Sequence, residues 1–334
     1  IVLLLSIGSC TFQEAPCDCD NRAAKIRAFS ILPPPQIPAD NPLTFCGIEL
    51  GRKLFYDTRL SEDGQTSCGS CHQLSMAFTD GQSVAKGAHQ KTGPRNSPTL
   101  FNLAWSPYFM MEGGVKSIEM QSLAPLLSDH EMMGSPHSLP DAVLQDPCYA
   151  TMSQTVFHRP MDYYVIVRAL AQFQRSLVSL DSHFDRVIYH KTELFTPAEQ
   201  RGWAIFTSPK AQCSTCHVPP LFTDFQFYDI GLKDTLDLGK ERESYHRHDR
   251  YKLKTPTLRN IELTPPYFHN GSVDHLEEVI EMYNLGMESE RLGKSKKIQP
   301  LHWTAQEKND LLAFLMTLTD WNAVQNERWL PLSE

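Results

Sequence analysis

The spacing of apolar residues along the chain predicts a mainly helical protein. Between residues 162 and 186, apolar side chains recur at steps of three or four positions: Ile166, Leu170, Phe173, Leu177, Leu180 and Phe184. This spacing places them on one face of a long amphipathic helix. The stretch ELGRKLFYDTRLS, within residues 41–60, predicts a shorter amphipathic helix. Alternating patterns typical of strands are few and short, so the expected class is mainly α.

Two capping boxes mark further helix starts. Thr196-Pro-Ala-Glu199 and Thr304-Ala-Gln-Glu307 each place a hydroxyl three residues before a glutamate. In this arrangement each side chain bonds a backbone N–H that the first helical turn leaves free. The stretch just before Thr196 is the expected domain boundary. We therefore expect an N-terminal domain at 41–190 and a C-terminal domain at 191–334.

The N-terminal stretch predicts an exported, membrane-anchored protein. IVLLLSIGSC, residues 1–10, is apolar but too short to span a bilayer. It looks like the end of a lipoprotein signal in which Cys10 carries the lipid. Residues 11–40 are polar and proline-rich, which predicts a tether. The expected location is the periplasm, where the chain is held to a membrane through this anchor.

Composition narrows the function classes. The 334 residues carry a net charge of −8, and no run of lysine and arginine stands out. Nucleic acid is therefore not an expected partner. Of the nine cysteines, Cys46 and Cys148 remain as candidates for a disulfide, while Cys17 and Cys19 fall in the tether. Sequence alone leaves the pairing open.

Two short motifs predict the cofactors. Cys68-Gly-Ser-Cys-His72 and Cys213-Ser-Thr-Cys-His217 both read C-x-x-C-H, the attachment motif of c-type haem. The cysteines bind the macrocycle, and the histidine becomes the proximal iron ligand. A zinc site is the alternative, but partner cysteines at zinc-ribbon spacing are missing. We expect two covalent haems, one in each of two cytochrome c-like domains.

From residue 41 onward the chain resembles the bacterial dihaem cytochrome c peroxidase family, which includes the related enzyme MauG. The resemblance rests on several stretches in matching order: LGRKLFYDTRLSEDG, AFTDG, GPRNSPTLFN, QSLAPLLSDHEM, TPTLRNIELTPPYFHNG and LEEVIEMYNLG. It implies that the N-terminal haem reacts with peroxide and that the C-terminal haem receives electrons. It also implies a small redox protein as electron donor and a homodimer.

The resemblance assigns roles near the first haem. Gln121 and Glu131 match the family's distal glutamine and catalytic glutamate, with Pro125 between them. A carboxylate there can take a proton from one peroxide oxygen and return it to the other. The alternative is that Glu131 is a surface acid in a loop. His89 lies one position away from a histidine that caps the resting haem in some members, or it is an ordinary loop histidine.

The resemblance also implies a calcium ion between the haems. Its ligands would be the Asn96 side chain and the backbone carbonyls of Thr264 and Pro266. Oxygen ligands with added water suit this hard cation. One departure from the family lies nearby. Met111 stands where the family has a tryptophan between the haems, so Trp105 and Tyr108 are the candidate aromatic substitutes.

The distal ligand of the second haem separates two kinds of enzyme. In the family it is a methionine fourteen residues after the histidine that matches His269, and this count reaches Tyr283. Met282 is the runner-up, because helix neighbours point about 100° apart and only one of the two can face the iron. Tyrosine is the ligand that MauG has. Three functions therefore remain open: a peroxidase, a MauG-like oxidase of a protein or other external substrate, and a non-catalytic dihaem electron carrier.

Overall fold

The computed structural model describes residues 17, 19–26, 31–234 and 236–331. The expected lipid-bearing Cys10 lies outside these residues. The fold is mainly helical, as predicted. The α-helices are α1 Phe45–Phe55, α2 Cys68–Cys71, α3 Ile118–Leu127, α4 Leu139–Val143, α5 Pro147–Phe157, α6 Tyr163–Ser176, α7 His183–Asp185, α8 Pro197–Phe206, α9 Glu241–Ser244, α10 Leu276–Asn284, α11 Ala305–Met316 and α12 Trp321–Val324. Strands β1 Phe227–Tyr228 and β2 Leu253–Lys254 pair antiparallel.

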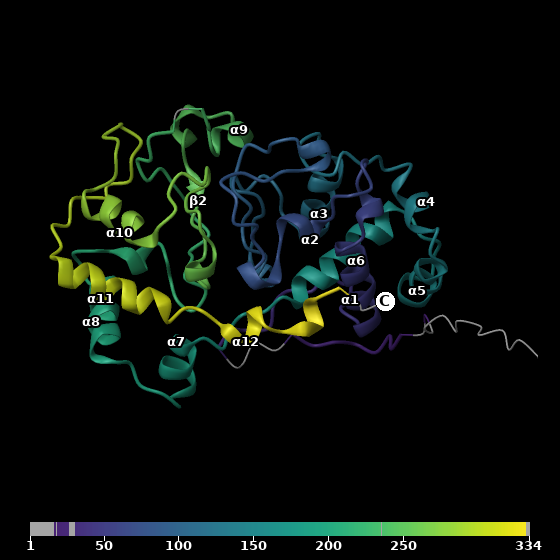
Figure 1. Cartoon of the computed structure of the whole chain (residues 1–334), viewed down its shortest axis with the longest axis horizontal. Helices are drawn as coiled ribbons and strands as arrows, with labels where there is room; N and C mark the ends of the chain where they lie inside the picture. Colours follow the sequence, from purple (N-terminus) through teal and green to yellow (C-terminus); the bar gives the residue numbers. More distant parts are fainter. Residues whose placement is uncertain (1–16, 18, 27–30, 235, 332–334) are drawn as a thin grey trace, which may run out of the picture.

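Two large hydrophobic cores organise the chain. The first core is built from α1, α5 and α6 and from the loops between them; the second is built from α8, α10 and α11. We call the stretch around the first core, Cys46–Leu177, the first half, and the stretch around the second core, Phe184–Leu318, the second half. The two halves lie side by side in Figure 1. After the second half, the chain returns to the first half, because Ala323, Val324 and Trp329 belong to the first core. None of the described helices is both long and apolar enough to cross a bilayer.

Each half contains a close helix crossing that depends on a glycine. At Gly51 in α1, a β-carbon would lie 1.9 Å from the Ala169 carbonyl oxygen of α6. At Gly202 in α8, it would lie 1.9 Å from the Asp310 carbonyl oxygen of α11. No side chain fits at either position, so only glycine permits these contacts. Each crossing involves the helix that precedes a C-x-x-C-H motif, so the two halves share this feature.

The predicted capping boxes are confirmed, but the long helix is shorter than expected. Thr196 and Thr304 cap α8 and α11 with reciprocal bonds from Glu199 and Glu307. The helix predicted over 162–186 ends at Ser176. Beyond it, Asn102 binds the chain through three hydrogen bonds, to the Leu177 carbonyl and to both backbone groups of Ser179. These tertiary bonds take backbone groups that a continuing helix would use.

The disulfide candidate Cys46–Cys148 is wrong. The structure instead pairs Cys17 with Cys148 and Cys19 with Cys46. The described part of the segment 11–40 lies against the first half, where the Asn21 amide also donates to the Thr155 carbonyl. This contact brings Cys17 to Cys148 and Cys19 to Cys46, so Cys46 and Cys148 do not bond each other.

Candidate functional site

A cavity of about 440 Å³ lies between residues of both halves, and its wall is mostly apolar. Its lining contains many of the residues expected at the second haem and the calcium ion: Cys213, Cys216, His217, Tyr283, Asn96, Thr264 and Pro266. Gln121 lines it from the first half, whereas Cys68, Cys71 and His72 do not belong to its lining. The structure therefore gathers the second C-x-x-C-H motif and the calcium candidates around one space.

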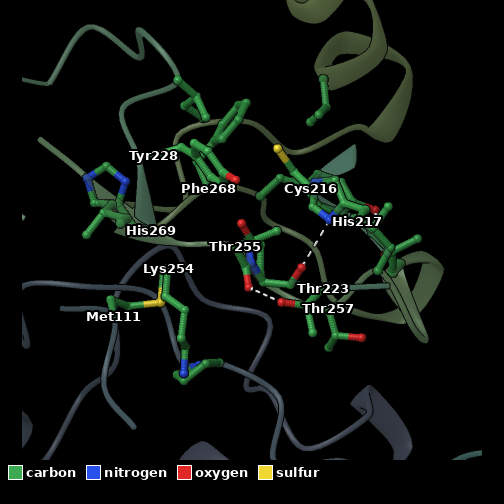
Figure 2. Close-up of a pocket in the computed structure, with 18 of the residues that line it drawn as sticks. Met111, Cys216, His217, Thr223, Tyr228, Lys254, Thr255, Thr257, Phe268 and His269 are labelled. Carbon is green, nitrogen blue, oxygen red and sulfur yellow. Dashed lines mark hydrogen bonds between the residues drawn. The ribbon is translucent and has the colours of Figure 1, made fainter. Parts of the chain in front are cut away.

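His217 is oriented by its backbone neighbours. Its Nδ1–H faces the carbonyl oxygens of Phe222 at 3.1 Å and Pro256 at 3.2 Å. Burial lowers the pKa of the imidazole, which favours the neutral form that binds metals. With Nδ1 engaged, Nε2 is the nitrogen left for an iron ligand. Figure 2 shows His217 and Cys216 together at one end of the pocket.

The thiols of this motif also fit a haem. Cys213 and Cys216 are free cysteines, and burial raises the pKa of the Cys213 thiol to about 12. Two free thiols beside an apolar cavity and a neutral imidazole are the donor set that covalent haem attachment needs. The residues present therefore fit the group that the motif implies.

A buried arginine anchors the loop behind His217. The Arg259 guanidinium donates to both carboxylate oxygens of Asp185, at 2.8 and 2.7 Å, and to the Pro220 carbonyl at 2.7 Å. Neither charged side chain of this pair is exposed. The loop that supplies the Phe222 carbonyl to His217 is thus tied to α7.

The helix α10 presents the two candidate distal ligands differently. Tyr283 lines the cavity, whereas Met282 is absent from the lining. Burial raises the pKa of the Tyr283 phenol, and the nearby Cys213 and Cys216 add to this shift. The helical register thus turns the tyrosine toward the second motif.

The first motif repeats the arrangement around its own histidine. His72 follows α2, and its Nδ1 lies 2.8 Å from the Phe78 carbonyl oxygen. Burial lowers the pKa of this imidazole and raises that of the Cys68 thiol to about 12 and of the Cys71 thiol to about 11. The donor set is the same as at the second motif, so it fits a second haem.

Gln121 and Glu131, the two catalytic candidates for the first haem, both belong to the first half. Gln121 is on α3, and its Oε1 is buried without a hydrogen-bond partner among the described residues. Burial raises the pKa of the Glu131 carboxyl, and its charge raises the thiol pKa values of Cys68 and Cys71. Glu131 therefore lies within electrostatic reach of the first motif. A buried amide oxygen without a partner is expected where a bound ligand donates a hydrogen bond to it, so the Gln121 Oε1 fits a ligand of that kind.

The structure does not bring His89 to these groups. Its side chain is 53% exposed and contacts the Glu62 carboxylate, while its backbone N–H donates to Asp63. The calcium candidates, in contrast, share the cavity wall. The Asn96 amide nitrogen donates to the Gln82 carbonyl at 2.6 Å, which leaves Oδ1 as the ligand atom. Of the two candidate substitutes for tryptophan, Tyr108 packs against the Phe227 ring at 6.0 Å, and Trp105 donates to the Pro33 carbonyl.

A residue that sequence reasoning missed also lines the cavity. Lys254 on β2 directs its ammonium to the Tyr108 carbonyl oxygen at 2.7 Å, across the junction of the halves. Nothing in the sequence distinguishes it from Lys252, which pairs with Asp249. The structure shows that Lys254, and not Lys252, lines the cavity.

Comparisons with known proteins agree with this arrangement. The family model described as di-haem cytochrome c peroxidase matches residues 46–193. The methylamine utilization protein MauG of Methylorubrum extorquens is 37% identical over 84% of this chain and 80% of its own length. The cytochrome-c peroxidase IdrP1 of Denitromonas iodatirespirans is 34% identical over 89% of this chain and 87% of its own.

A solved structure gives the same result. The crystal structure of a MauG-like protein associated with microbial copper homeostasis superposes with a TM-score of 0.86. The two are 34% identical, and the match covers 90% of this chain and 96% of that one. Two C-x-x-C-H motifs, a mainly helical fold and these relatives all lead to one conclusion. The chain belongs to the di-haem cytochrome c peroxidase family.

Proposed function

We propose that this protein is a peroxidase that reduces hydrogen peroxide to water. Electrons from a small redox protein would enter at the second motif, and peroxide would react at the first. The observation that carries the proposal is Glu131, a carboxyl with a raised pKa within electrostatic reach of Cys68 and Cys71. The cytochrome-c peroxidases among the relatives support it.

The chain supplies the positions for two haems. His72 and His217 would each offer Nε2 to iron, with the paired cysteines beside them. Bound haem supplies the redox chemistry, namely iron that changes oxidation state and an open face at which peroxide binds. Neutral, backbone-anchored imidazoles hold the ligand orientation fixed.

Glu131 and Gln121 would handle the protons. Reduction of one peroxide to two waters consumes two electrons and two protons. The Glu131 carboxylate would accept a proton from one peroxide oxygen and deliver it to the other. The orphaned Oε1 of Gln121 would accept a hydrogen bond from peroxide or water and so position it.

Steady-state turnover tests this proposal. Holoprotein is mixed with peroxide and a reduced small c-type cytochrome, and oxidation of the donor is followed by absorbance. Sustained turnover that requires both partners supports the peroxidase. Absence of any spectral response to peroxide would instead leave an electron carrier.

A MauG-like oxidase is the second candidate, and Tyr283 is the observation that favours it. A phenolate is a hard anionic ligand that stabilises ferric and higher states, whereas a thioether raises the potential. Tyr283 lines the cavity, and the count from His269 in the sequence matches it to the family's methionine. Slow turnover with the donor, combined with a long-lived oxidised spectrum after peroxide alone, would favour this function.

We further propose a calcium ion held by Asn96, Thr264 and Pro266, and a periplasmic location with the lipid anchor at Cys10. The three calcium candidates line one cavity wall. The pairs Cys17–Cys148 and Cys19–Cys46 support the location, because disulfides persist in oxidising compartments. Metal analysis of the purified protein before and after chelation tests the ion, and mass spectrometry of the mature N-terminus tests the anchor.

A further inference from the structure

Lys254 places a positive charge at the junction of the two halves. Its backbone N–H donates to the Met111 carbonyl at 2.9 Å, and its ammonium donates to the Tyr108 carbonyl at 2.7 Å. Both bonds cross from the second half to the first. Lys254 and Met111 line the cavity, and Figure 2 shows them next to each other, away from Cys216 and His217.

This charge differs from the other cations near the cavity. The buried or half-buried arginines there are each paired with carboxylates: Arg95 with Glu112 and Asp237, Arg259 with Asp185, and Arg291 with Asp229. Lys254 forms no ion pair with any carboxylate of the described residues, and burial alone lowers its pKa to about 8. A backbone carbonyl satisfies one of the three ammonium donors and does not neutralise the charge.

Lys254 is half-buried, and an ammonium that is partly removed from water without an anion is costly, so a missing partner is the physical explanation to test. Haem brings such a partner, because its macrocycle carries two propionate carboxylates. The arginines of the lining, Arg259 and Arg291, are already committed to aspartates. Lys297, the other lysine of the lining, lies at the opposite end, with its amine 3.7 Å from Cys216 Sγ. Among the lysines and arginines that line the cavity, Lys254 is thus the one that lies at the junction of the two halves and has no carboxylate partner among the described residues.

We propose that Lys254 is the counter-charge for a haem carboxylate at the junction between the two halves. The inference rests on the proposed function only in requiring haem at the two motifs. A fixed cation near a redox centre stabilises its reduced form, because it attracts the added electron. Lys254 therefore raises the potential of the haem that it pairs with. Lys254 lies beside Met111, the position at which the related family has a tryptophan between the haems. The Lys254 charge therefore acts on electron transfer between the two haems at this position.

The test compares two lysines that are two residues apart. Lys254→Met removes the junction charge, and Lys252→Met removes a charge already paired with Asp249, with the same change in net charge. Spectroelectrochemical titration measures the midpoint potential of each haem, and resonance Raman spectroscopy measures the propionate bending band. We expect Lys254→Met to lower one midpoint and shift that band. Lys252→Met and Lys254→Arg should leave both near the wild-type values.

The proposal is overturned if both midpoints and the propionate band in Lys254→Met match those of Lys252→Met. If Lys254→Met yields no holoprotein, Lys254→Gln is measured in the same way and carries the same two outcomes. Haem content by the pyridine haemochrome assay confirms that both haems are attached. Peroxide turnover is measured separately on the wild type, so a failure of the peroxidase proposal leaves the potentials and the Raman band interpretable.

Discussion

Replacing Arg259 with leucine should be among the most destabilising single changes in the second half. The substitution removes two hydrogen bonds to Asp185 and one to the Pro220 carbonyl, all within 2.7–2.8 Å. Asp185 keeps the Ser182 backbone N–H and hydroxyl, each at 2.9 Å, but it loses its counter-charge. Both side chains of the pair are 0% exposed, so water cannot replace the guanidinium.

The expected loss is about 3–5 kcal/mol in the free energy of unfolding, the usual cost of removing one partner of a buried ion pair. The matched control is Arg159→Leu, whose partner Asp162 and own side chain are 33% and 43% exposed. Exposed pairs of this kind contribute about 0–1 kcal/mol. A double variant, Arg259→Leu with Asp185→Asn, removes the stranded charge and keeps an oxygen for Ser182. It should recover part of the loss.

Guanidinium denaturation of the holoproteins, followed by far-ultraviolet circular dichroism, measures these differences. The reasoning fails if Arg259→Leu falls within about 1 kcal/mol of Arg159→Leu, the size of an exposed pair. It also fails if the double variant is less stable than Arg259→Leu, because the loss would then come from packing and not from an uncompensated charge.

Three further predictions concern the chemistry. Glu131→Gln should slow the reaction with peroxide by about 10²–10⁴-fold with both haems still attached; stopped-flow absorbance checks this, and the exposed neighbour variant Asp129→Asn should react normally. Burial raises the pKa of Glu131, and only its carboxylate form accepts a proton. The rate of the reaction with peroxide should therefore fall as pH drops through an apparent pKa above 4.5. An inflection of the pH–rate profile at or below 4.5 contradicts the assignment. Tyr283→Met should raise the potential of the second haem and add a near-infrared methionine–haem band; a wild type that already shows the band refutes Tyr283 as ligand.

Local chemistry explains what the sequence could predict. The bonds of a capping box form within four residues, so Thr196 and Thr304 marked their helix starts without tertiary information. The C-x-x-C-H spacing likewise predicts His72 and His217 as iron ligands from local sequence alone. Counting from His269 selected Tyr283 over Met282, and the helical register places Tyr283 at the cavity.

Long-range contacts explain what could not be predicted. The end of α6 depends on Asn102, which is 75 positions before Leu177 in the chain and bonds its carbonyl. The partner of Cys148 is 131 residues away, in a segment whose composition resembles a free tether. Lys254 lines the cavity and bonds Tyr108, which is 146 positions before it in the chain, whereas Lys252 pairs with its sequence neighbour Asp249.

The return of the C-terminal residues to the first core affects how the protein is made. Tyr56, directly after α1, donates to the Trp329 carbonyl at 2.7 Å, and Arg52 on α1 donates to the Arg328 carbonyl at 2.7 Å. Trp329 packs against Phe78 and Phe101, so the first core is complete only when nearly the whole chain is present. During synthesis, the first half is therefore made early, but its core can be completed only after the C-terminal residues have been made. A chain that ended before Trp321 would lack Ala323, Val324 and Trp329, which belong to the first core. Correct packing of the first half therefore depends on synthesis of the C-terminal residues (Figure 1).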